Sequence, residues 1–377
     1  MIASRSAEVV VIGAGIAGAS AAWALAEHCD TVLIELESQP GSHATGRSAA
    51  VISETSGPAA VCALAAASRP WLARPPTDLG SDSLLTSRGL LWVADNTTAD
   101  QLDVIETTAR NLGIPVEPLS SAQARRRVPV LRSDWLVQAV LEPMAMNIDV
   151  ARLLAGFLGG FRDRGGVLRC ADPALRLEPT GERWRVVTPS GTITASAVVN
   201  AAGAWADQVA QTAGLPPIGL QPLRRTAFVF PVDGVSSWPV VMDVGSRFYF
   251  EPEGPGLLAS PADETPSEPT DARADELDIA RAVDALAQAT TLEVKGVHSS
   301  WAGLRTFAPD RLPVVGPDPL APGLFWLAGQ GGGGIKTSPA LAHYVTALVV
   351  DGTPPAELGG IDLQPFHGQI RPDRLRR

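Results

Sequence analysis

The chain has 377 residues and a formal net charge of −10, and this length allows two domains that each bury a core. Its acidic charge and its lack of a basic run argue against a nucleic acid or an anionic membrane surface as partner. Its three cysteines, Cys29, Cys62 and Cys170, are too far apart in the sequence for a zinc site or a disulfide framework, so we predict no metal site.

The first segments of the chain predict a strand–turn–helix–strand unit. We expect residues 1–8 to form a polar leader and residues 9–12 (VVVI) to form a buried strand. An alanine-rich helix follows, and residues 31–34 (TVLI) form a second strand. The turn between the first strand and the helix carries the motif GxGxxG.

This motif favours dinucleotide binding. Gly13 permits a tight turn, Gly15 lets a pyrophosphate approach the backbone, and Gly18 lets the helix pack closely on the sheet. The N-terminus of the helix offers free N–H groups to phosphate. Glu35, 17 residues beyond Gly18, can accept hydrogen bonds from ribose hydroxyls. An ordinary glycine-rich turn would not require this acid.

Small residues fill the next segment, residues 41–50 (GSHATGRSAA). It cannot form a core strand, but it can wrap a cofactor because its backbone N–H groups can face phosphate; the alternative is a surface loop. Beyond it, apolar periodicity and breaker residues predict further elements. We expect helices at residues 58–75, 99–113, 120–127 and 148–161, strands at residues 84–86, 89–94 and 167–169, and a hairpin of residues 184–187 and 192–194.

Two later segments repeat the strand–glycine–helix pattern. A strand at residues 197–200 runs into a small-residue turn, and a strand at residues 324–328 precedes the loop 329–336 (GQGGGGIK) and a helix at 337–350. Strands dominate residues 221–301, interrupted by one helix at about 275–289. A cofactor touched at three separate places favours FAD over NAD, because NAD-dependent dehydrogenases usually need one such unit.

The chain also shows no sign of export or of membrane insertion. No apolar run reaches the roughly 18–20 residues that a membrane helix needs. No signal-peptide pattern precedes the first strand. We therefore expect a cytoplasmic protein without a membrane span.

Taken in order, six segments of the chain resemble the FAD-dependent D-amino-acid oxidase superfamily, and within it most closely the D-arginine dehydrogenases. The resemblance runs from about residue 9 to about residue 348, and the six segments together are specific although none is alone. They are GAGIAGAS (13–20), HATGRSAA (43–50), VVNAAGAWAD (198–207), LQPLRRTAF (220–228), WAGLRTF (301–307) and the loop 329–336.

The resemblance implies an α/β fold with a Rossmann-like FAD-binding domain and an α+β substrate domain whose sheet is mostly antiparallel. The FAD-binding domain would comprise residues 1–78, 145–222 and 305–365. The substrate domain would comprise residues 79–144 and 223–304. Residues 366–377 would form a C-terminal tail.

The resemblance also assigns the cofactor contacts. FAD would be held without a covalent bond, because residues 303–306 contain no counterpart of the cysteine that links flavin in sarcosine oxidases. Its contacts would be Gly13, Gly15, Ala17, Gly18, Glu35, Leu36, Ala44, Thr45, Gly46, Arg47, Ser48, Ala49, Ala50, Val51, Ala174, Gly331, Gly332, Gly333, Gly334, Ile335 and Lys336.

The implied chemistry is hydride transfer from the substrate Cα to flavin N5, which the protein serves mainly by orienting the substrate. Arg225 and Arg305 would bind the substrate carboxylate, since a guanidinium offers a planar bidentate fork. Tyr249 would assist them, and the carbonyl of Gly332 would accept a hydrogen bond from the amine. Lys336 would stabilise negative charge at flavin N1 and C2=O. Without the motif context, these arginines would be interpreted as surface or ion-paired residues.

The implied side-chain pocket is lined by Val51, Leu90, Val240 and Met242. Leu90 stands where D-arginine dehydrogenases carry a carboxylate that pairs with the guanidinium. Burying an unpaired cation costs several kcal/mol. We therefore expect an apolar D-amino acid to be preferred over D-arginine and D-lysine.

Three functions follow from these residues. The first is oxidative deamination of a D-amino acid to an imino acid, which hydrolyses to a 2-oxo acid and ammonia. The second is oxidation of a secondary amine such as an N-alkyl amino acid. The third is a flavin subunit that needs a partner chain or has no turnover, which the retention of Arg225 and Arg305 disfavours. The substrate is a small amino acid in the first two functions, and the electron acceptor, oxygen or a quinone-like carrier, stays open.

Overall fold

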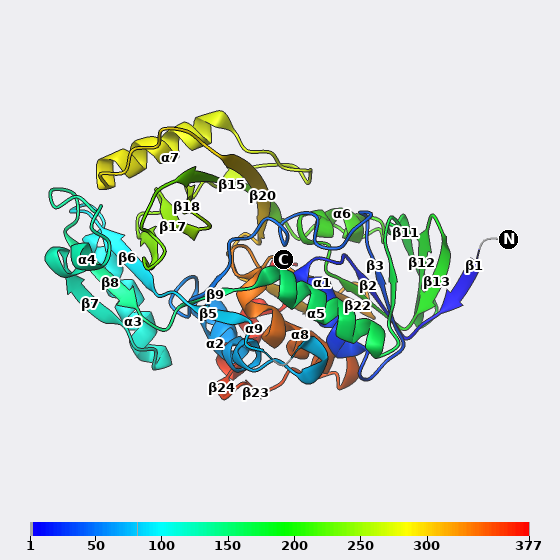
Figure 1. The fold of residues 1–377 in the computed structure, drawn as a ribbon. Helices are drawn as coiled ribbons and strands as arrows, with labels where there is room; N and C mark the ends of the chain where they lie inside the picture. The colour runs from blue at the N-terminus through cyan, green and yellow to red at the C-terminus, as the bar shows by residue number, and fades with distance from the viewer. Residues whose placement is uncertain (1–2, 81, 377) are drawn as a thin grey trace.

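Two large sheets organise the part of the chain that the computed structural model describes, residues 3–80 and 82–376 (Figure 1). The strands of the first sheet are Val9–Ile12 (β2), Thr31–Ile34 (β3), Val167–Arg169 (β10), Ala197–Asn200 (β14), Val314–Pro317 (β21) and Leu324–Ala328 (β22). Their spatial order is β10-β3-β2-β14-β22-β21, and all neighbours are parallel except β21 and β22. This arrangement is the Rossmann-like sheet that the sequence predicted.

The first sheet is covered on both faces. In β2, Val9 and Val11 pack with the helices, whereas Val10 and Ile12 pack into a separate core on the opposite face. Burial of both faces explains why these strands are continuous apolar runs. The helices on the first face are α1 (Ile16–Leu25), α2 (Ala59–Ala73), α5 (Val150–Asp163) and α8 (Gly334–Val350).

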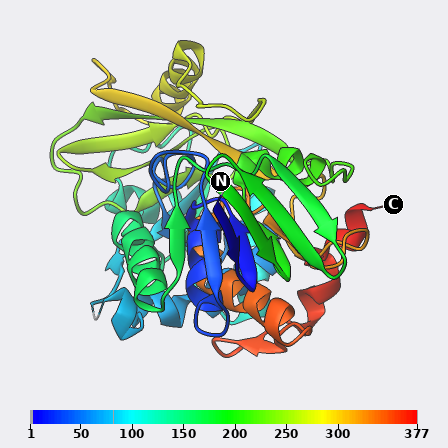
Figure 2. The same ribbon diagram turned by 90° about the vertical axis from the view of Figure 1, so that its right-hand side faces the viewer.

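A four-stranded sheet contributes to the core on the opposite face of the first sheet. Figure 2 shows the molecule from the side on which this four-stranded sheet lies. Its strands are Ala3–Ser6 (β1), Arg176–Thr180 (β11), Arg183–Thr188 (β12) and Gly191–Ala195 (β13). The prediction of a polar leader is therefore wrong for residues 3–6. A polar strand can form there because β13 supplies backbone hydrogen bonds along a parallel register, with Ser4 opposite Thr192.

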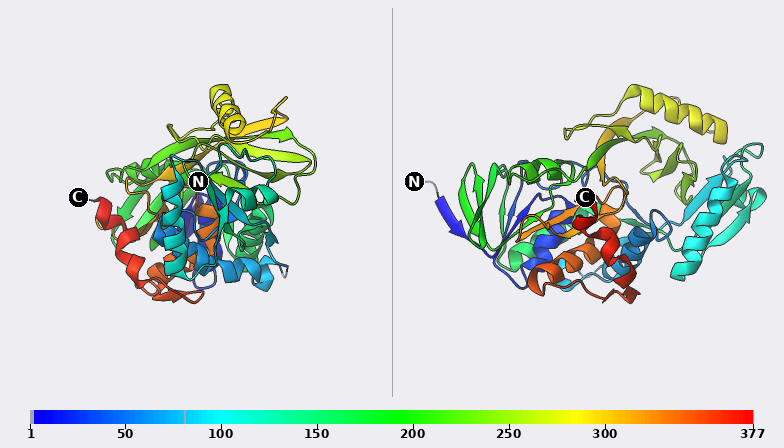
Figure 3. Two further views of the ribbon diagram at one scale, coloured as in Figure 1. Left: turned by 90° about the vertical axis from the view of Figure 1, so that its left-hand side faces the viewer. Right: turned by 180° about the vertical axis from the view of Figure 1, so that it is seen from behind.

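The second large sheet has nine strands and lies in a separate lobe (Figures 1 and 3). They are Leu90–Ala94 (β6), Glu117–Ser120 (β7), Gln138–Glu142 (β8), Gln221–Pro231 (β15), Val240–Asp243 (β16), Tyr249–Glu253 (β17), Gly256–Ser260 (β18), Thr265–Pro266 (β19) and Ser299–Phe307 (β20). All paired neighbours are antiparallel except β6 and β16. The sheet is thus mostly antiparallel, as predicted.

One face of this second sheet is closed by the helix Glu276–Ala289 (α7). Phe228, Phe230 and Phe250 pack there with Ala282 and Leu286 of the helix. The opposite face, which carries Leu90, Val240 and Tyr249, is turned towards the first sheet and its glycine loops. The two lobes therefore meet at the face that the sequence assigned to the substrate.

Shorter elements complete the fold. Three of them, Val51–Ile52 (β4), Leu85–Ser87 (β5) and Met146–Ile148 (β9), form a small sheet. The others are Leu102–Leu112 (α3), Ser121–Arg127 (α4), Ala206–Gln211 (α6), Glu357–Leu358 (β23), Ile361–Asp362 (β24) and His367–Ile370 (α9). No helix within residues 3–80 and 82–376 has the length and apolar character needed to cross a membrane.

Candidate functional site

The turn between β2 and α1 requires glycine at two positions. Gly13 has φ +99°, and an ideal Cβ placed on it would lie 2.7 Å from the carbonyl oxygen of Ala201. A Cβ on Gly18 would lie 1.8 Å from the carbonyl oxygen of Gly13. The motif therefore brings the N-terminus of α1 directly against the ends of β2 and β14, where a phosphate can approach backbone N–H groups.

The carboxylate of Glu35 lies at this turn. Its Oε2 accepts a hydrogen bond from the Ala14 N–H at 2.5 Å, and its Oε1 accepts one from the Glu37 N–H at 2.9 Å. Glu35 is buried and lines the adjoining cavity. It thus connects the end of β3 to the glycine turn, and its contact with ribose hydroxyls stays a prediction.

A cavity of about 320 Å³ extends from the glycine turn along the edge of the first sheet. Of the residues assigned to FAD, those that line it are Gly13, Gly15, Ala17, Glu35, Leu36, Ala44, Thr45, Ala174, Gly331 and Gly334. The Nε2 atom of Gln330, whose residue lines the same cavity, is buried and has no hydrogen-bond partner among the described residues. A backbone cradle made by glycines and an orphaned donor fit a dinucleotide.

Two aromatic residues of this cavity were not predicted from the sequence. The rings of His43 and Trp205 lie 4.6 Å apart, and both residues line the cavity wall. His43 Nε2 also lies 2.8 Å from Glu37 Oε1. The motif at 43–50 predicted cofactor contact for this segment, but no pattern in the sequence pairs His43 with Trp205, which lies 162 positions later.

A second cavity of about 180 Å³ adjoins the first, sharing Ile16, Ala44, Thr45, Leu304, Gly331 and Gly334 with it. All four residues expected to act on the substrate line it, namely Arg225, Tyr249, Arg305 and Gly332. The four expected pocket residues, Val51, Leu90, Val240 and Met242, also line it. So do twelve of the residues assigned to FAD, namely Ala44, Thr45, Arg47, Ser48, Ala49, Ala50, Val51, Gly331, Gly332, Gly334, Ile335 and Lys336. Gly18, Gly46 and Gly333 line neither cavity.

Arg305 presents a free guanidinium to this second cavity. Among the described residues, none lies within hydrogen-bond or ion-pair distance of its guanidinium. Its Nη1 atom lies only 3.1 Å from the position that a Cβ on Gly332 would occupy. A half-buried guanidinium without a counter-ion is a ready binding site for an anion.

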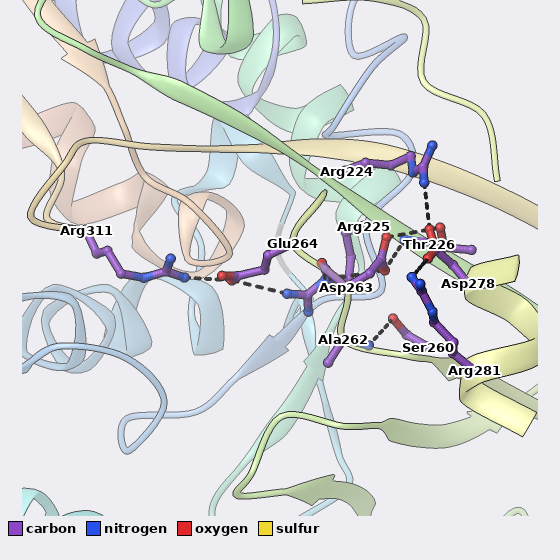
Figure 4. Close-up of polar contacts among 10 residues, drawn as sticks. All are labelled: Arg224, Arg225, Thr226, Ser260, Ala262, Asp263, Glu264, Asp278, Arg281 and Arg311. Carbon is purple, nitrogen blue, oxygen red and sulfur yellow. Dashed lines mark hydrogen bonds and ion pairs between the residues drawn. The ribbon is translucent and has the colours of Figure 1, made fainter. Parts of the chain in front are cut away.

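Arg225 is held beside Arg305 by the turn between β18 and β19 (Figure 4). Its Nε donates to the Asp263 carbonyl oxygen at 2.7 Å, and its Nη2 lies 3.4 Å from Glu264 Oε1. Glu264 also accepts a hydrogen bond from Arg311 at 2.6 Å. Burial and the nearby charge of Arg305 lower the pKa of Arg225 to about 10, so it remains a cation at neutral pH.

The neighbouring Arg224 shows why only one of the two adjacent arginines reaches the cavity. Residues alternate between the two faces of a strand. Arg224 therefore points to the α7 side, where its Nη2 donates to Asp278 Oδ2 at 2.7 Å (Figure 4). Arg225 on the other face lines the cavity.

Lys336 is a buried residue and not a surface residue at a helix start, since its side chain is only 6% exposed. Its Nζ donates to the carbonyl oxygens of Ser53 at 2.8 Å and Ser56 at 2.6 Å. Burial lowers its pKa. Lys336 thus connects the N-terminal turn of α8 to the loop after β4 while lining the cavity, and its role towards flavin stays a prediction.

The loop after β4 is closed and well packed. The carboxylate of Glu142, fully buried, accepts hydrogen bonds from Ser53 Oγ and Thr55 Oγ1, each at 2.6 Å, and from the Glu54 N–H at 2.8 Å. These hydrogen bonds fix the loop beside the second cavity, which Ser53 and Ser56 line.

The expectation of a wholly apolar pocket is wrong. Glu251, which is 4% exposed, lines the second cavity with Leu90, Val240 and Met242. Burial raises its pKa to about 7. A signal was available in the sequence, because Glu251 lies two positions after Tyr249 and strand residues two apart share a face.

Comparison with known proteins assigns this chain to a protein family. Residues 8–348 match the family model DAO, described as FAD dependent oxidoreductase. The chain belongs to this family. It is therefore an FAD-dependent oxidoreductase.

Similar proteins agree with this assignment. Glycine oxidase of Geobacillus kaustophilus is 27% identical over 95% of this chain and 96% of its own length. Its crystal structure matches with a TM-score of 0.83 over 96% of this chain and 98% of that one, at 25% identity. The structure of L-proline dehydrogenase from P. horikoshii, 21% identical, has the same fold with a TM-score of 0.84 over 100% of this chain and 99% of that one.

Mitochondrial dimethylglycine dehydrogenase of Rattus norvegicus is similar to part of the chain. It is 28% identical over 259 residues, which are 63% of this chain. The match covers only 30% of that relative's length.

Among residues 3–80 and 82–376, no group of three His, Cys, Asp or Glu side chains is placed to hold a metal ion.

Proposed function

We propose that the protein oxidises the CH–NH bond of an amino acid whose carboxylate is held by Arg305 and Arg225. The observation that carries this proposal is the unpartnered guanidinium of Arg305, which lies beside a second buried arginine in a cavity next to the glycine loop. Two cations in one cavity repel each other, so an anionic ligand between them relieves an unfavourable charge.

Four residues of the second cavity bind the substrate in this proposal. The two guanidinium groups hold the carboxylate through charge-assisted hydrogen bonds, each worth about 1.5–3 kcal/mol. The Tyr249 hydroxyl, which has no hydrogen-bond partner among the described residues, adds a further donor. The Gly332 carbonyl accepts a hydrogen bond from the amine. Bound FAD supplies the hydride acceptor, and the chain fixes the substrate Cα against it.

The first candidate substrate is a D-amino acid, as the sequence motifs imply. Its oxidation gives an imino acid, which water converts into a 2-oxo acid and ammonia. The apolar side chains of Leu90, Val240 and Met242, which line the second cavity, support a substrate that carries a side chain.

An N-methylated glycine is the second candidate. The similarity to dimethylglycine dehydrogenase favours it. The same carboxylate clamp serves both substrates, and the pocket that receives a side chain can also receive an N-substituent. A flavin subunit without turnover remains the third possibility, which the arrangement of both arginines and Tyr249 around one cavity disfavours.

Anaerobic bleaching of the flavin absorbance tests the proposal. The purified protein is mixed with D-amino acids, their L-enantiomers, glycine, N-methylglycine and N,N-dimethylglycine. Bleaching by the D-series over the L-series supports the first candidate, and bleaching only by the N-methylated compounds supports the second. No bleaching by any of these compounds, and no turnover with an artificial electron acceptor, would refute amino-acid oxidation.

A further inference from the structure

Glu251 is the only carboxylate among the described residues that line the second cavity. It lies on β17 two residues after Tyr249, whose partner across the sheet is Met242. Leu90 pairs with Val240 on the next two strands. These residues line one cavity together. Among the described residues, neither Arg225 nor Arg305 lies within ion-pair distance of Glu251.

The hydrogen bonding of Glu251 is incomplete. Its Oε2 accepts one hydrogen bond, from Asn147 Nδ2 at 3.2 Å. Its Oε1 has no partner among the described residues, yet it is absent from the fully buried orphan atoms, so it reaches the cavity surface. The charge of Arg88 lowers the pKa of Glu251. However, Arg88 donates its hydrogen bonds to the carbonyl oxygens of Ser236 and Trp238 and not to Glu251.

A comparison with Glu142 shows what a purely structural carboxylate looks like in this fold. Glu142 is buried at least as deeply, but three donors satisfy it, and it does not line the cavity. A carboxylate oxygen that has accessible surface and no protein donor is free to accept a hydrogen bond from a ligand. The free oxygen of Glu251 is explained if a ligand supplies the missing donor.

We propose that Glu251 is a specificity-determining residue that accepts a hydrogen bond from a donor at the end of the substrate side chain. This inference rests on the proposed function and deepens it, because it names the substrate class. The substrate has a carboxylate at one end for Arg305 and Arg225, an apolar middle against Leu90, Val240 and Met242, and an amine or guanidinium at the other end. The cation also offsets the cost of burying the Glu251 carboxylate.

Matched substrates test this assignment. D-ornithine and D-norleucine have side chains of equal length that differ only in the terminal ammonium or methyl group. We expect wild-type protein to oxidise D-ornithine with the larger kcat/KM. Glu251→Gln should lower the ratio of the two kcat/KM values at least ~10-fold, because a neutral amide carries no negative charge to pair with the ammonium. Glu253→Gln is the control, since Glu253 lies on the same strand but is exposed and outside the cavity.

A binding measurement separates this inference from the proposed function. 5-Aminopentanoate and hexanoate are the corresponding pair without an α-amine, and their binding can be followed by the absorbance change of the bound flavin. Glu251→Gln should weaken the binding of 5-aminopentanoate at least ~10-fold relative to the binding of hexanoate. An unchanged ratio in both assays would overturn the role of Glu251 while leaving amino-acid oxidation intact. A changed binding ratio without flavin reduction by any amino acid would refute the proposed function but keep Glu251 as the recognition residue.

Discussion

Arg305 and Gly332 are in close contact, because an ideal Cβ on Gly332 would lie 3.1 Å from Arg305 Nη1. Gly332→Ala must therefore displace the guanidinium by a few tenths of an ångström or more. Since small misplacements of a reacting group can cost up to ~100-fold, we expect kcat/KM to fall by about tenfold or more with the FAD content unchanged. Steady-state kinetics and flavin absorbance measure the two quantities.

Gly159→Ala is the matched control for this substitution. Gly159 lies in α5 and has open space around its Cα, so alanine fits without displacing any side chain. Its kcat/KM should equal that of the wild type. Equal kinetics for Gly332→Ala and Gly159→Ala would show that the position of Arg305 does not depend on Gly332.

Glu264 links two arginines, since its Oε1 lies 3.4 Å from Arg225 Nη2 and 2.6 Å from Arg311 Nη2. Glu264→Gln should leave Arg225 held by the Asp263 carbonyl oxygen but less well aligned. Because the pair is partly exposed and such pairs contribute little, we expect KM for the substrate to rise only about two- to fivefold, with kcat nearly constant. Glu268→Gln, on the same exposed segment, should change neither quantity.

The fold was predictable because its signals are local. Apolar runs, glycine turns and helix periodicity are contained in short stretches, and the strands predicted at residues 9–12, 31–34, 197–200 and 324–328 lie where those patterns placed them. β1 was not predictable in this way, because polar residues become a strand there only through pairing with β13.

The site was predictable only in part. The family resemblance implied roles for Arg225, Tyr249, Arg305 and Gly332, and the structure brings all four to one cavity. Glu251 was missed, although its spacing from Tyr249 carried the information. The residues that oppose the rise of its pKa on burial, Asn147 and Arg88, come from distant segments that no sequence period connects to it.

Gly13 is expected to decide cofactor binding. Gly13→Ala would strain a residue at φ +99° and bring its Cβ to 2.7 Å from the Ala201 carbonyl oxygen. The turn must then move away from the phosphate position, so the FAD content per chain should fall severalfold. Gly113→Ala is the control, since Gly113 also has a positive φ but has open space around it. In the wild type, acid should release intact FAD, because residues 303–306 contain no linking cysteine.

The raised pKa of Glu251 predicts a pH-dependent stability. Burial raises this pKa from 4.5 to about 7, opposed by Asn147 and Arg88 and assisted by Glu253. The folded state therefore binds more protons than the unfolded state between pH 4.5 and 7, and the free energy of unfolding decreases as the pH rises through this window. Since one pKa unit corresponds to about 1.36 kcal/mol, the total loss is on the order of 3 kcal/mol.

Chemical denaturation of wild type and Glu251→Gln at pH 4.5 and pH 8 measures this effect. Glutamine does not titrate, so the variant should gain stability relative to the wild type as the pH rises. A constant difference between the two proteins across this range would mean that Glu251 titrates normally in the folded state.

The central claim is that Arg305 binds the substrate carboxylate, and one measurement tests it most directly. The kcat/KM of Arg305→Ala and Arg305→Lys is compared with wild type on the best substrate of the bleaching panel, with FAD content measured in parallel. The account predicts a loss of ~100-fold or more for alanine, only partial recovery for lysine because an ammonium cannot form the bidentate pair, and an unchanged FAD content. An Arg305→Ala protein with near-normal kcat/KM would contradict the account, because the carboxylate would then be held elsewhere.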